Sequence, residues 1–308
     1  MMDFLFVFYA THMGKKQQTA VPIYENFSHA EDIWMNIFGL GKFETYQFLY
    51  AECRDIDHFK SWIIDVKGAE FFHHATLQFN NWQASSSVSA TISPTLLSPA
   101  QLLCWEQQGY LKISGLVEDV LCDAVKDLIS DHLNLSDSWY PAHPDWHGLM
   151  LQVYQDARLE AIRKHPQVHR LFAELYNTLN IISNTDKLSF NPPETDSWKF
   201  KGSALHWDLD LSKPVEYYIQ GLIYLDDVPE DRGPLILVPG FHHQFTDFIQ
   251  SFSSLDEAIV AVRAVTSPIP VPGVKGDVVV WLSTLPHAAS ANHSTQPRFV
   301  QYLNFSTL

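Results

Sequence analysis

The sequence predicts a mainly β domain with flanking helices, preceded by a separate N-terminal extension. From residue 186 onward, short apolar runs follow one another at short spacing, with Gly and Pro turns between them. Between residues 98 and 179 the apolar residues recur instead at helical spacing. Helices followed by closely spaced strands of this kind are typical of an α+β domain whose core is a β-sandwich or barrel.

The composition is that of an ordinary globular protein and excludes several classes of partner. The formal charge of −15 over 308 residues disfavours nucleic acid, because phosphate neutralisation needs clustered Lys and Arg. No apolar run approaches the length of a membrane span, so we expect no membrane partner. An odd number of cysteines without C-x-x-C spacing predicts reduced thiols in a cytoplasmic protein; these are Cys53, Cys104 and Cys122.

Residues 1–90 carry the weakest pattern. Residues 4–10 are apolar but too few for a membrane span, and Asp3 stands where a signal peptide would carry positive charge. We therefore expect a buried strand there and no signal peptide. Residues 58–68 have an amphipathic helical period that stops at Gly68.

A stretch rich in Ser, Thr and Pro at residues 84–99 is typical of a linker and predicts a domain boundary. We expect an N-terminal extension of unknown role at 1–90 and a second domain at 91–308, with its strand-rich core at about 186–308. The extension could cover the mouth of a barrel, mediate dimerisation or serve stability. The pattern does not choose among these roles, and it leaves the oligomeric state open.

The second domain is expected to begin with helices. Ser98-Pro99 fits an N-cap followed by proline at the first helical position, and Gly109 ends that helix. Residues 110–113 alternate like a strand. Apolar residues at helical spacing then predict helices at 117–133 and 166–179.

The remainder is expected to be strands. Each predicted strand is an apolar run closed by Gly, Pro or polar residues, and one short helix is expected at 251–264. The predicted strands cover residues 188–191, 204–208, 217–225, 233–240, 276–282 and 298–305.

The candidate chemistry begins with His206-Trp207-Asp208, which stands where an apolar run ends. Residues i and i+2 of a strand point to one face, so the imidazole and the carboxylate would lie side by side. With one further histidine they would form the 2-His-1-carboxylate triad that holds non-haem Fe(II) and leaves coordination positions open.

The tripeptide alone is weak evidence. Among fifteen histidines, about one H-x-D is expected by chance. A second one occurs at His143-Pro144-Asp145, and an H-x-E occurs at His29-Ala30-Glu31. Proline restricts the backbone of His143 and no strand leads into that motif, so we expect a structural or substrate-side loop there.

Residues near the C-terminus supply what the other motifs lack. His287 follows the predicted strand at 276–282, and Arg298 opens the next strand eleven positions later. Antiparallel strands of a barrel can bring both beside His206 and Asp208. The guanidinium is a planar fork that suits the far carboxylate of a dicarboxylic co-substrate.

Residues 97–308 resemble the phytanoyl-CoA dioxygenase family of Fe(II)/2-oxoglutarate oxygenases, which have a double-stranded β-helix (jelly roll, cupin-like) core. The resemblance rests on motifs that occur in the family's order. These are the helix–Gly109-Tyr110–strand opening, Lys164-His165-Pro166, Asn191-Pro192-Pro193, His206-x-Asp208, Asp226-Asp227 leading to Gly233-Pro234-Leu235, Val238-Pro239-Gly240-Phe241-His242, and Gly276-Asp277 to His287 followed by Arg298.

The resemblance assigns roles to particular residues. It implies that iron is held by His206, Asp208 and His287, and that Arg298 binds the C5 carboxylate of 2-oxoglutarate. His293 competes with His287 for the second histidine, but only His287 keeps the family's spacing to the arginine. Two more residues are candidates for lining the co-substrate pocket, with plain core positions as the alternative: Asn191 and Trp281.

The same resemblance implies the reaction. Related halogenases carry Gly or Ala where this chain has Asp208, so we expect hydroxylation of a small molecule, with Fe(II), 2-oxoglutarate and O2 consumed or held and succinate and CO2 released. Two alternatives stay open. One is a catalytically silent jelly-roll domain that binds a ligand or partner, and the other is a cupin-type metal enzyme that does not use 2-oxoglutarate. An intact triad together with Arg298 favours the oxygenase.

Overall fold

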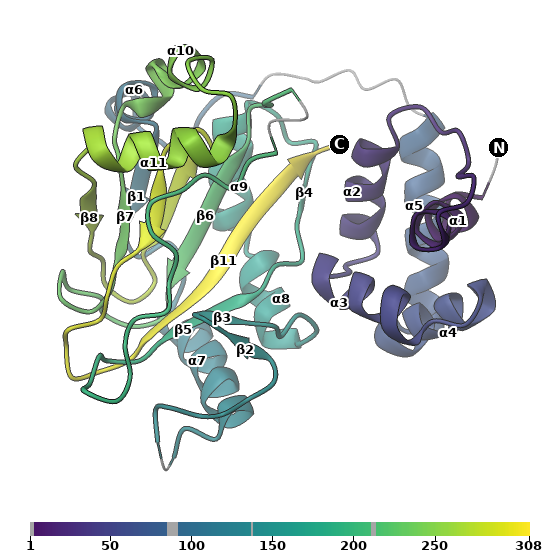
Figure 1. The fold of residues 1–308 in the computed structure, drawn as a ribbon, viewed down its shortest axis with the longest axis horizontal. Helices are drawn as coiled ribbons and strands as arrows, with labels where there is room; N and C mark the ends of the chain where they lie inside the picture. Colours follow the sequence, from purple (N-terminus) through teal and green to yellow (C-terminus); the bar gives the residue numbers. More distant parts are fainter. Residues whose placement is uncertain (1–2, 85–91, 137, 211–213) are drawn as a thin grey trace. The chain divides into compact units, whose positions relative to one another are not determined.

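The computed structural model describes residues 3–84, 92–136, 138–210 and 214–308 (Figure 1). The predicted linker includes residues 85–91, which lie outside the described residues. The chain divides into two compact units, each with its own core. The first is Met1–Ala90 with Asn180–Asp186 and Ser306–Leu308, and the second is Thr91–Leu179 with Lys187–Phe305.

The first unit is helical and has an aromatic core. Its helices are α1 (Phe4–Gln17), α2 (Phe27–Ile37), α3 (Lys42–Gln47), the π-helical turn η1 (Phe48–Glu52), α4 (Ile56–Lys67) and α5 (Ala69–Ala84). The helix predicted at 58–68 is confirmed as α4, and Gly68 follows it with φ of 90°. That backbone conformation favours glycine, which explains why the helix ends there.

The strand predicted at residues 4–10 is wrong, because these residues open helix α1. Phe4, Leu5, Val7 and Phe8 are buried, which is the i, i+1, i+3, i+4 spacing of a helix face, whereas Phe6 is 49% exposed. An amphipathic helix would have a polar residue at position 6. Because Phe6 is apolar, the sequence shows a continuous apolar run instead of a helical period. Asp3 caps the helix by accepting a hydrogen bond from the backbone N–H of Leu5.

The second unit is built on two antiparallel sheets, which form the predicted jelly-roll core (Figure 1). The main sheet has the strand order β1-β9-β6-β11-β5-β3-β2, and the smaller sheet has the order β10-β7-β8. Strand β4 belongs to the segment Asn180–Asp186 of the first unit. The strands are β1 (Tyr110–Ile113), β2 (Trp146–His147), β3 (Met150–Leu151), β4 (Ile181–Ser183), β5 (Leu188–Asn191), β6 (Ile219–Tyr224), β7 (Leu235–Leu237), β8 (Ile269–Val271), β9 (Val278–Leu282), β10 (His287–Ala289) and β11 (Arg298–Thr307).

Helices flank these sheets as predicted. They are α6 (Pro99–Gln108), α7 (Asp119–Leu133), α8 (Ala157–Arg163), α9 (Pro166–Tyr176), the 3-10 turn η2 (Phe241–His243), α10 (Phe245–Ile249) and α11 (Leu255–Val265). The predicted start of α6 is confirmed, since the Ser98 side chain accepts from the backbone N–H of Gln101. Helix α9 stops three residues before the predicted end, because Asn177 adopts a left-handed conformation.

The side chains of strand β11 point alternately toward the flanking helices and into the barrel. The ring of Phe305 packs on Phe172 of α9, and the side chain of Gln301 donates to a backbone carbonyl of α8. Successive residues of a strand point to opposite faces. Arg298, an even-numbered residue of the same strand, therefore points away from these helices and into the barrel.

The strand predicted at 204–208 does not form over this length. Only His206 makes strand-type hydrogen bonds, as an isolated bridge to His287. A strand forms only along a partner, and β10 spans just three residues that are already paired to β7. A side chain holds the segment in place instead, because Arg263 of α11 donates to the Leu205 carbonyl. Across the described ranges, no helix combines the length and apolar character needed to cross a membrane.

Candidate active site

Two histidines from distant parts of the chain are joined through their backbones. The N–H of His206 donates to the carbonyl of His287 at 3.0 Å, and the N–H of His287 donates back at 2.9 Å. This pair of bonds sets the two imidazole centroids 4.9 Å apart. Strand pairing at one residue is thus enough to bring together side chains that are 81 positions apart in the sequence (287 − 206).

Asp208 completes the cluster. Its two carboxylate oxygens lie 3.5 Å from Nε2 of His206 and 3.4 Å from Nε2 of His287. Partial enclosure opposes ionisation of the carboxyl, but the contacts with the two imidazoles outweigh it and hold the pKa of Asp208 below its usual range. The hydrogen bond to Asp208 in turn raises the pKa of His206.

The donor set fits a divalent metal ion. Nδ1 of His206 lies 2.8 Å from the Ala204 carbonyl, and Nδ1 of His287 lies 3.1 Å from the Leu285 carbonyl. Carbonyl oxygens only accept, so each Nδ1 carries a proton and each Nε2 of a neutral ring carries the lone pair. Ligand atoms from both rings and Asp208 lie within 4.8 Å of one another. Two imidazoles and one carboxylate on one side match the donor set of non-haem Fe(II).

A hydrogen-bonded relay orients the carboxylate from behind. The amide nitrogen of Gln220 donates to Asp208 at 2.8 Å, and the indole N–H of Trp281 donates to the amide oxygen of Gln220 at 3.1 Å. Gln220 and Trp281 face each other on the paired strands β6 and β9. The Trp281 ring also lies 5.3 Å from that of His287. Trp281 therefore borders the cluster.

Arg298 is a buried cation, only 1% exposed. Its two terminal nitrogens donate to the Gly233 carbonyl and to the hydroxyl of Ser189, each at 2.8 Å, while Nε has no partner. Among the described residues no carboxylate pairs with it. Burial lowers the pKa of this guanidinium, and a buried charge without a counter-ion is costly. Arg298 could therefore be neutralised by an anionic ligand.

Gly233 links this arginine to the triad. Its carbonyl accepts from Arg298, and four residues further on Leu237 pairs with His287. Gly233 has φ of 69°, and an added Cβ would lie 2.5 Å from the amide nitrogen of Asn191. Glycine is therefore required here by both its conformation and its close neighbours. Asn191 is itself fully buried opposite Arg298, with an unpartnered amide oxygen.

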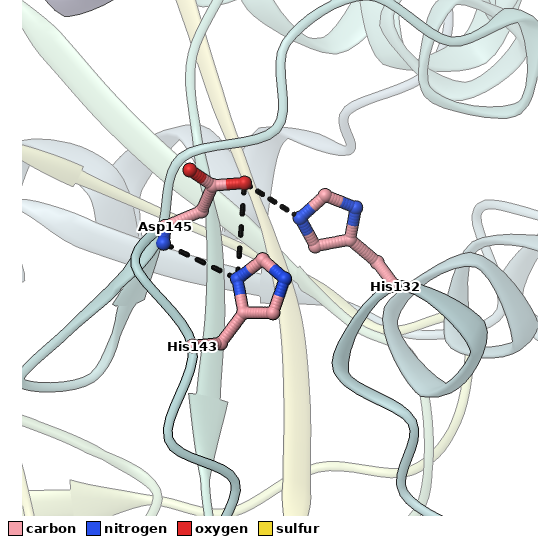
Figure 2. A group of neighbouring side chains, drawn as sticks. All are labelled: His132, His143 and Asp145. Atoms are coloured by element: carbon pink, nitrogen blue, oxygen red, sulfur yellow. Dashed lines mark hydrogen bonds and ion pairs between the residues drawn. The ribbon is translucent and has the colours of Figure 1, made fainter.

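The other candidate histidines lie elsewhere. His293 is largely exposed, and its Nδ1 lies 3.3 Å from the carboxylate of Glu194. The second H-x-D motif is joined by His132 in a separate cluster (Figure 2). Its members are His132, His143 and Asp145.

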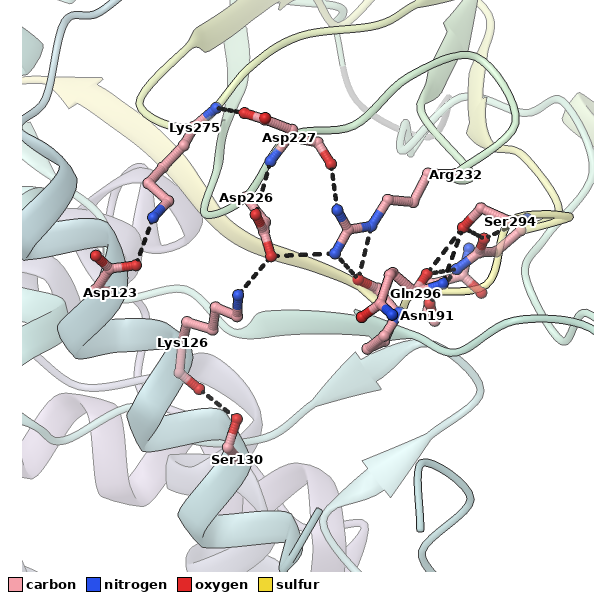
Figure 3. A network of polar contacts seen from close by, with 12 residues as sticks. Asp123, Lys126, Ser130, Asn191, Asp226, Asp227, Arg232, Lys275, Ser294 and Gln296 are labelled. Atoms are coloured by element: carbon pink, nitrogen blue, oxygen red, sulfur yellow. Dashed lines mark hydrogen bonds and ion pairs between the residues drawn. The ribbon is translucent and has the colours of Figure 1, made fainter. Parts of the chain in front are cut away.

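A charged network holds the loop that leads to Gly233 (Figure 3). Asp226 accepts from Lys126 at 2.5 Å and from Arg232 at 3.1 Å, and Arg232 also donates to the carbonyls of Asp227 and Pro297. The network thus ties this loop to the residue before Arg298. Burial of Asp226 opposes its ionisation, but the two cations outweigh that effect and lower its pKa.

Sequence reasoning missed three supporting residues: Ser189, Gln220 and Arg232. Gln220 had a signal, because it is a polar residue within an otherwise apolar strand. Ser189 likewise interrupts an apolar run. Arg232 lies in a polar turn where charge is ordinary, so nothing in the pattern singled it out.

Comparison with known proteins shows to which family the chain belongs. The family model of phytanoyl-CoA dioxygenase (PhyH) matches residues 105–300, which is more than half of the chain. The chain belongs to the phytanoyl-CoA dioxygenase family. This membership confirms the resemblance drawn from the sequence, and it agrees with the cofactors predicted there, Fe(II), 2-oxoglutarate and O2.

A curated relative is known from Dictyostelium discoideum and carries the provisional name phytanoyl-CoA dioxygenase. It is 24% identical over 185 residues, covering 46% of this chain and 51% of the relative. The chain thus spans about half the length of the curated relative it matches.

Solved structures share the fold. The α-ketoglutarate-dependent carbocyclase SnoK from nogalamycin biosynthesis is 20% identical with a TM-score of 0.52, covering 70% of this chain and 87% of its own. AviO1 from Streptomyces viridochromogenes Tue57 is 18% identical with a TM-score of 0.52, covering 70% and 96%. The epimerase SnoN, solved with Fe3+, α-ketoglutarate and nogalamycin RO, is 16% identical with a TM-score of 0.51, covering 68% and 82%. At these identities the likeness establishes the jelly-roll fold.

Proposed function

We propose that this chain is an Fe(II)- and 2-oxoglutarate-dependent dioxygenase that hydroxylates a small molecule and releases succinate and CO2. One observation carries the proposal. A His–Asp–His cluster with both Nε2 lone pairs turned inward shares a barrel with a buried arginine that lacks a carboxylate partner among the described residues. Family membership supports the reaction class.

Each residue has a defined task in this proposal. His206, His287 and Asp208 would hold Fe(II) through two Nε2 atoms and a carboxylate oxygen. When bound, the iron with 2-oxoglutarate and O2 supplies the oxidising power for insertion of oxygen into a C–H bond. Arg298 would neutralise the distal carboxylate of 2-oxoglutarate, with Asn191 and Trp281 lining its pocket.

An anionic co-substrate would explain why the cationic side chain of Arg298 is buried. Ser189 and the Gly233 carbonyl hold its two terminal nitrogens without cancelling its charge, since both are neutral. A dicarboxylate would supply the missing anion through charge-assisted hydrogen bonds, which are about twice as strong as neutral ones. A cupin-type enzyme without 2-oxoglutarate would have no use for this buried cation.

The proposal is tested by adding Fe(II) and then 2-oxoglutarate to the full-length protein without oxygen. We expect a visible absorption band when 2-oxoglutarate binds to protein-held Fe(II), and succinate release once oxygen is admitted. His287→Ala should abolish the band, whereas His293→Ala, which alters an exposed histidine outside the cluster, should leave it unchanged.

Arg298 is tested in the same assay. Loss of a buried charge-assisted contact costs about 2–5 kcal/mol, so Arg298→Ala should weaken 2-oxoglutarate binding at least about thirtyfold while Fe(II) still binds. Bound iron with no effect of 2-oxoglutarate would refute the proposal in favour of a cupin-type enzyme. A protein that binds no iron would be a silent binding domain.

A further inference from the structure

A second group of metal-ligating side chains lies outside the active site, at the end of α7 and in the loop that follows (Figure 2). His132 belongs to the last turn of α7, and His143 and Asp145 precede β2. One ligand atom from each lies within 4.8 Å of the others. The proposed oxygenase reaction gives none of these residues a task.

We propose that His132, His143 and Asp145 bind a divalent zinc ion. Figure 2 shows both rings turned toward the carboxylate. One oxygen of Asp145 lies 2.8 Å from Nε2 of His132 and 3.8 Å from Nδ1 of His143. Ligands of tetrahedral zinc lie about 3.3 Å apart, given bond lengths of about 2.0–2.1 Å. Shifts of about 0.5 Å in each of these two distances would reach that geometry.

Each ring offers one nitrogen to a metal once that nitrogen gives up its present hydrogen bond. The backbone N–H of Asp145 donates to Nδ1 of His143 at 3.2 Å, so this nitrogen carries a lone pair. A carboxylate only accepts, so Nε2 of His132 carries the proton in its bond to Asp145. Zinc would take the place of that proton and release it to solvent, as metal binding to histidine commonly does.

The three side chains are partly exposed, so zinc could reach them from solvent and keep a fourth coordination position open. The exposed fractions of the three side chains are 30% for His132, 24% for His143 and 42% for Asp145. An ion entering from solvent would keep a water as its fourth ligand. The formal charge of −15 on the chain favours the net positive charge that zinc would bring.

The site would act as a clip on the loop before β2. Eight residues (135–142) lie between Asn134, which follows α7, and His143, and none of the described ones belongs to a helix or strand. The loop continues into Trp146, whose ring stacks on Trp198 at 6.2 Å and 7°. Zinc bound across the loop would hold both ends of it to the helix.

The test uses full-length protein in which His206→Ala and His287→Ala remove the two candidate iron-binding histidines. The metal content then reports on the second site. After equilibration with zinc and dialysis, we expect one zinc per chain. Cobalt in place of zinc should give the intense visible bands of a tetrahedral ion. Zinc should also raise the melting temperature and slow proteolysis of the loop.

Adding His132→Ala or His143→Ala should weaken zinc binding by about a hundredfold or more, because each removes a direct ligand. His147→Ala is the matched control, since it removes an exposed histidine of the same segment that lies outside the cluster. Each variant is first checked for an unchanged circular dichroism spectrum. If the background protein holds no zinc, the three side chains form only a hydrogen-bonded group and the proposal is wrong. Binding that survives both variants would place the ion elsewhere and refute it equally.

Discussion

At the scale of single residues, the candidate active site depends on side chains that hold Asp208 and Arg298 in place. Gln220 holds Asp208, Trp281 holds Gln220, and Ser189 holds Arg298. Each of these hydrogen bonds fixes the orientation of the side chain that it reaches. Partners of metal ligands are worth about ten- to a hundredfold in metal affinity.

Gln220→Leu should therefore weaken Fe(II) binding by about ten- to a hundredfold, because the carboxylate of Asp208 loses the donor that orients it. Anaerobic Fe(II) titration measures this change. Trp281→Phe keeps the ring beside His287 but removes the indole donor to Gln220, so its effect should be smaller and in the same direction. Wild-type affinity in Gln220→Leu would show that Asp208 needs no such support.

Gly233→Ala should destabilise the protein by more than about 2 kcal/mol, since it combines a left-handed backbone with a Cβ 2.5 Å from Asn191 and 2.9 Å from the Ser290 carbonyl. Gly115→Ala is a matched control: φ there is 61°, but a Cβ would meet nothing within 4 Å. It should cost about 1 kcal/mol. Urea denaturation measures both, and equal losses would mean that the Asn191 contact is unimportant.

At the scale of elements, helix α9 anchors the segment that leads into α6. The carboxylate of Glu174 is buried and accepts from the backbone N–H groups of Thr95, Leu96 and Leu97 at 2.6–2.9 Å, and Arg170 donates to it as well. Burial opposes ionisation, yet these donors outweigh it and lower the pKa of Glu174 to about 2.

This lowered pKa makes stability depend on pH. The contribution of ionised Glu174 is complete above the unfolded pKa of about 4.3 and is lost as the pH falls from there to about 2. It amounts to about 3 kcal/mol. We expect Glu174→Gln to lose that stability at pH 7 and to approach wild type near pH 2, in denaturant unfolding across this range. Glu230→Gln alters an exposed carboxylate and should follow wild type throughout. A Glu174→Gln deficit that stays constant with pH would contradict the explanation.

At the scale of the whole molecule, the chain has two cores of different kinds. The second unit is organised around sheets, whereas the first packs aromatic rings between helices. Phe59 is fully buried and lies within 5.6 Å of Phe8 and 5.9 Å of Trp62 by ring centroids. We propose that the first unit unfolds separately from the jelly roll, because every buried apolar residue of its core lies between Phe4 and Phe79.

Phe59→Ala should then cost about 3–5 kcal/mol and lower one thermal transition only. The expected Fe(II)–2-oxoglutarate band should persist, since His206, Asp208 and His287 belong to the other unit. Phe43→Ala removes a ring that is 53% exposed and should change stability by about 0.5 kcal/mol or less. A single transition that moves as a whole, with loss of the band, would show one cooperative unit.

Local pattern accounts for most of the elements that were predicted. Helices α4, α6, α7 and α11 have one apolar face and clear end signals, and strands β5, β6 and β9 are apolar runs between turns. Helix α1 was misread because Phe6 makes its outer face apolar too. Strands of two or three residues, such as β2 and β10, are too short to leave a periodic signal.

By itself the sequence determined a β-sandwich or barrel and the candidate residues His206, Asp208, His287 and Arg298, because these depend on residue type, order and spacing. The motifs in their order gave the family resemblance, and the resemblance implied the jelly-roll class. Only the tertiary structure decided which side chains support them and which histidine joins the second H-x-D motif. Gln220 meets Asp208, and His132 meets Asp145, through contacts that sequence spacing does not specify. Such contacts follow from strand register and helix placement, which arise when the whole chain packs.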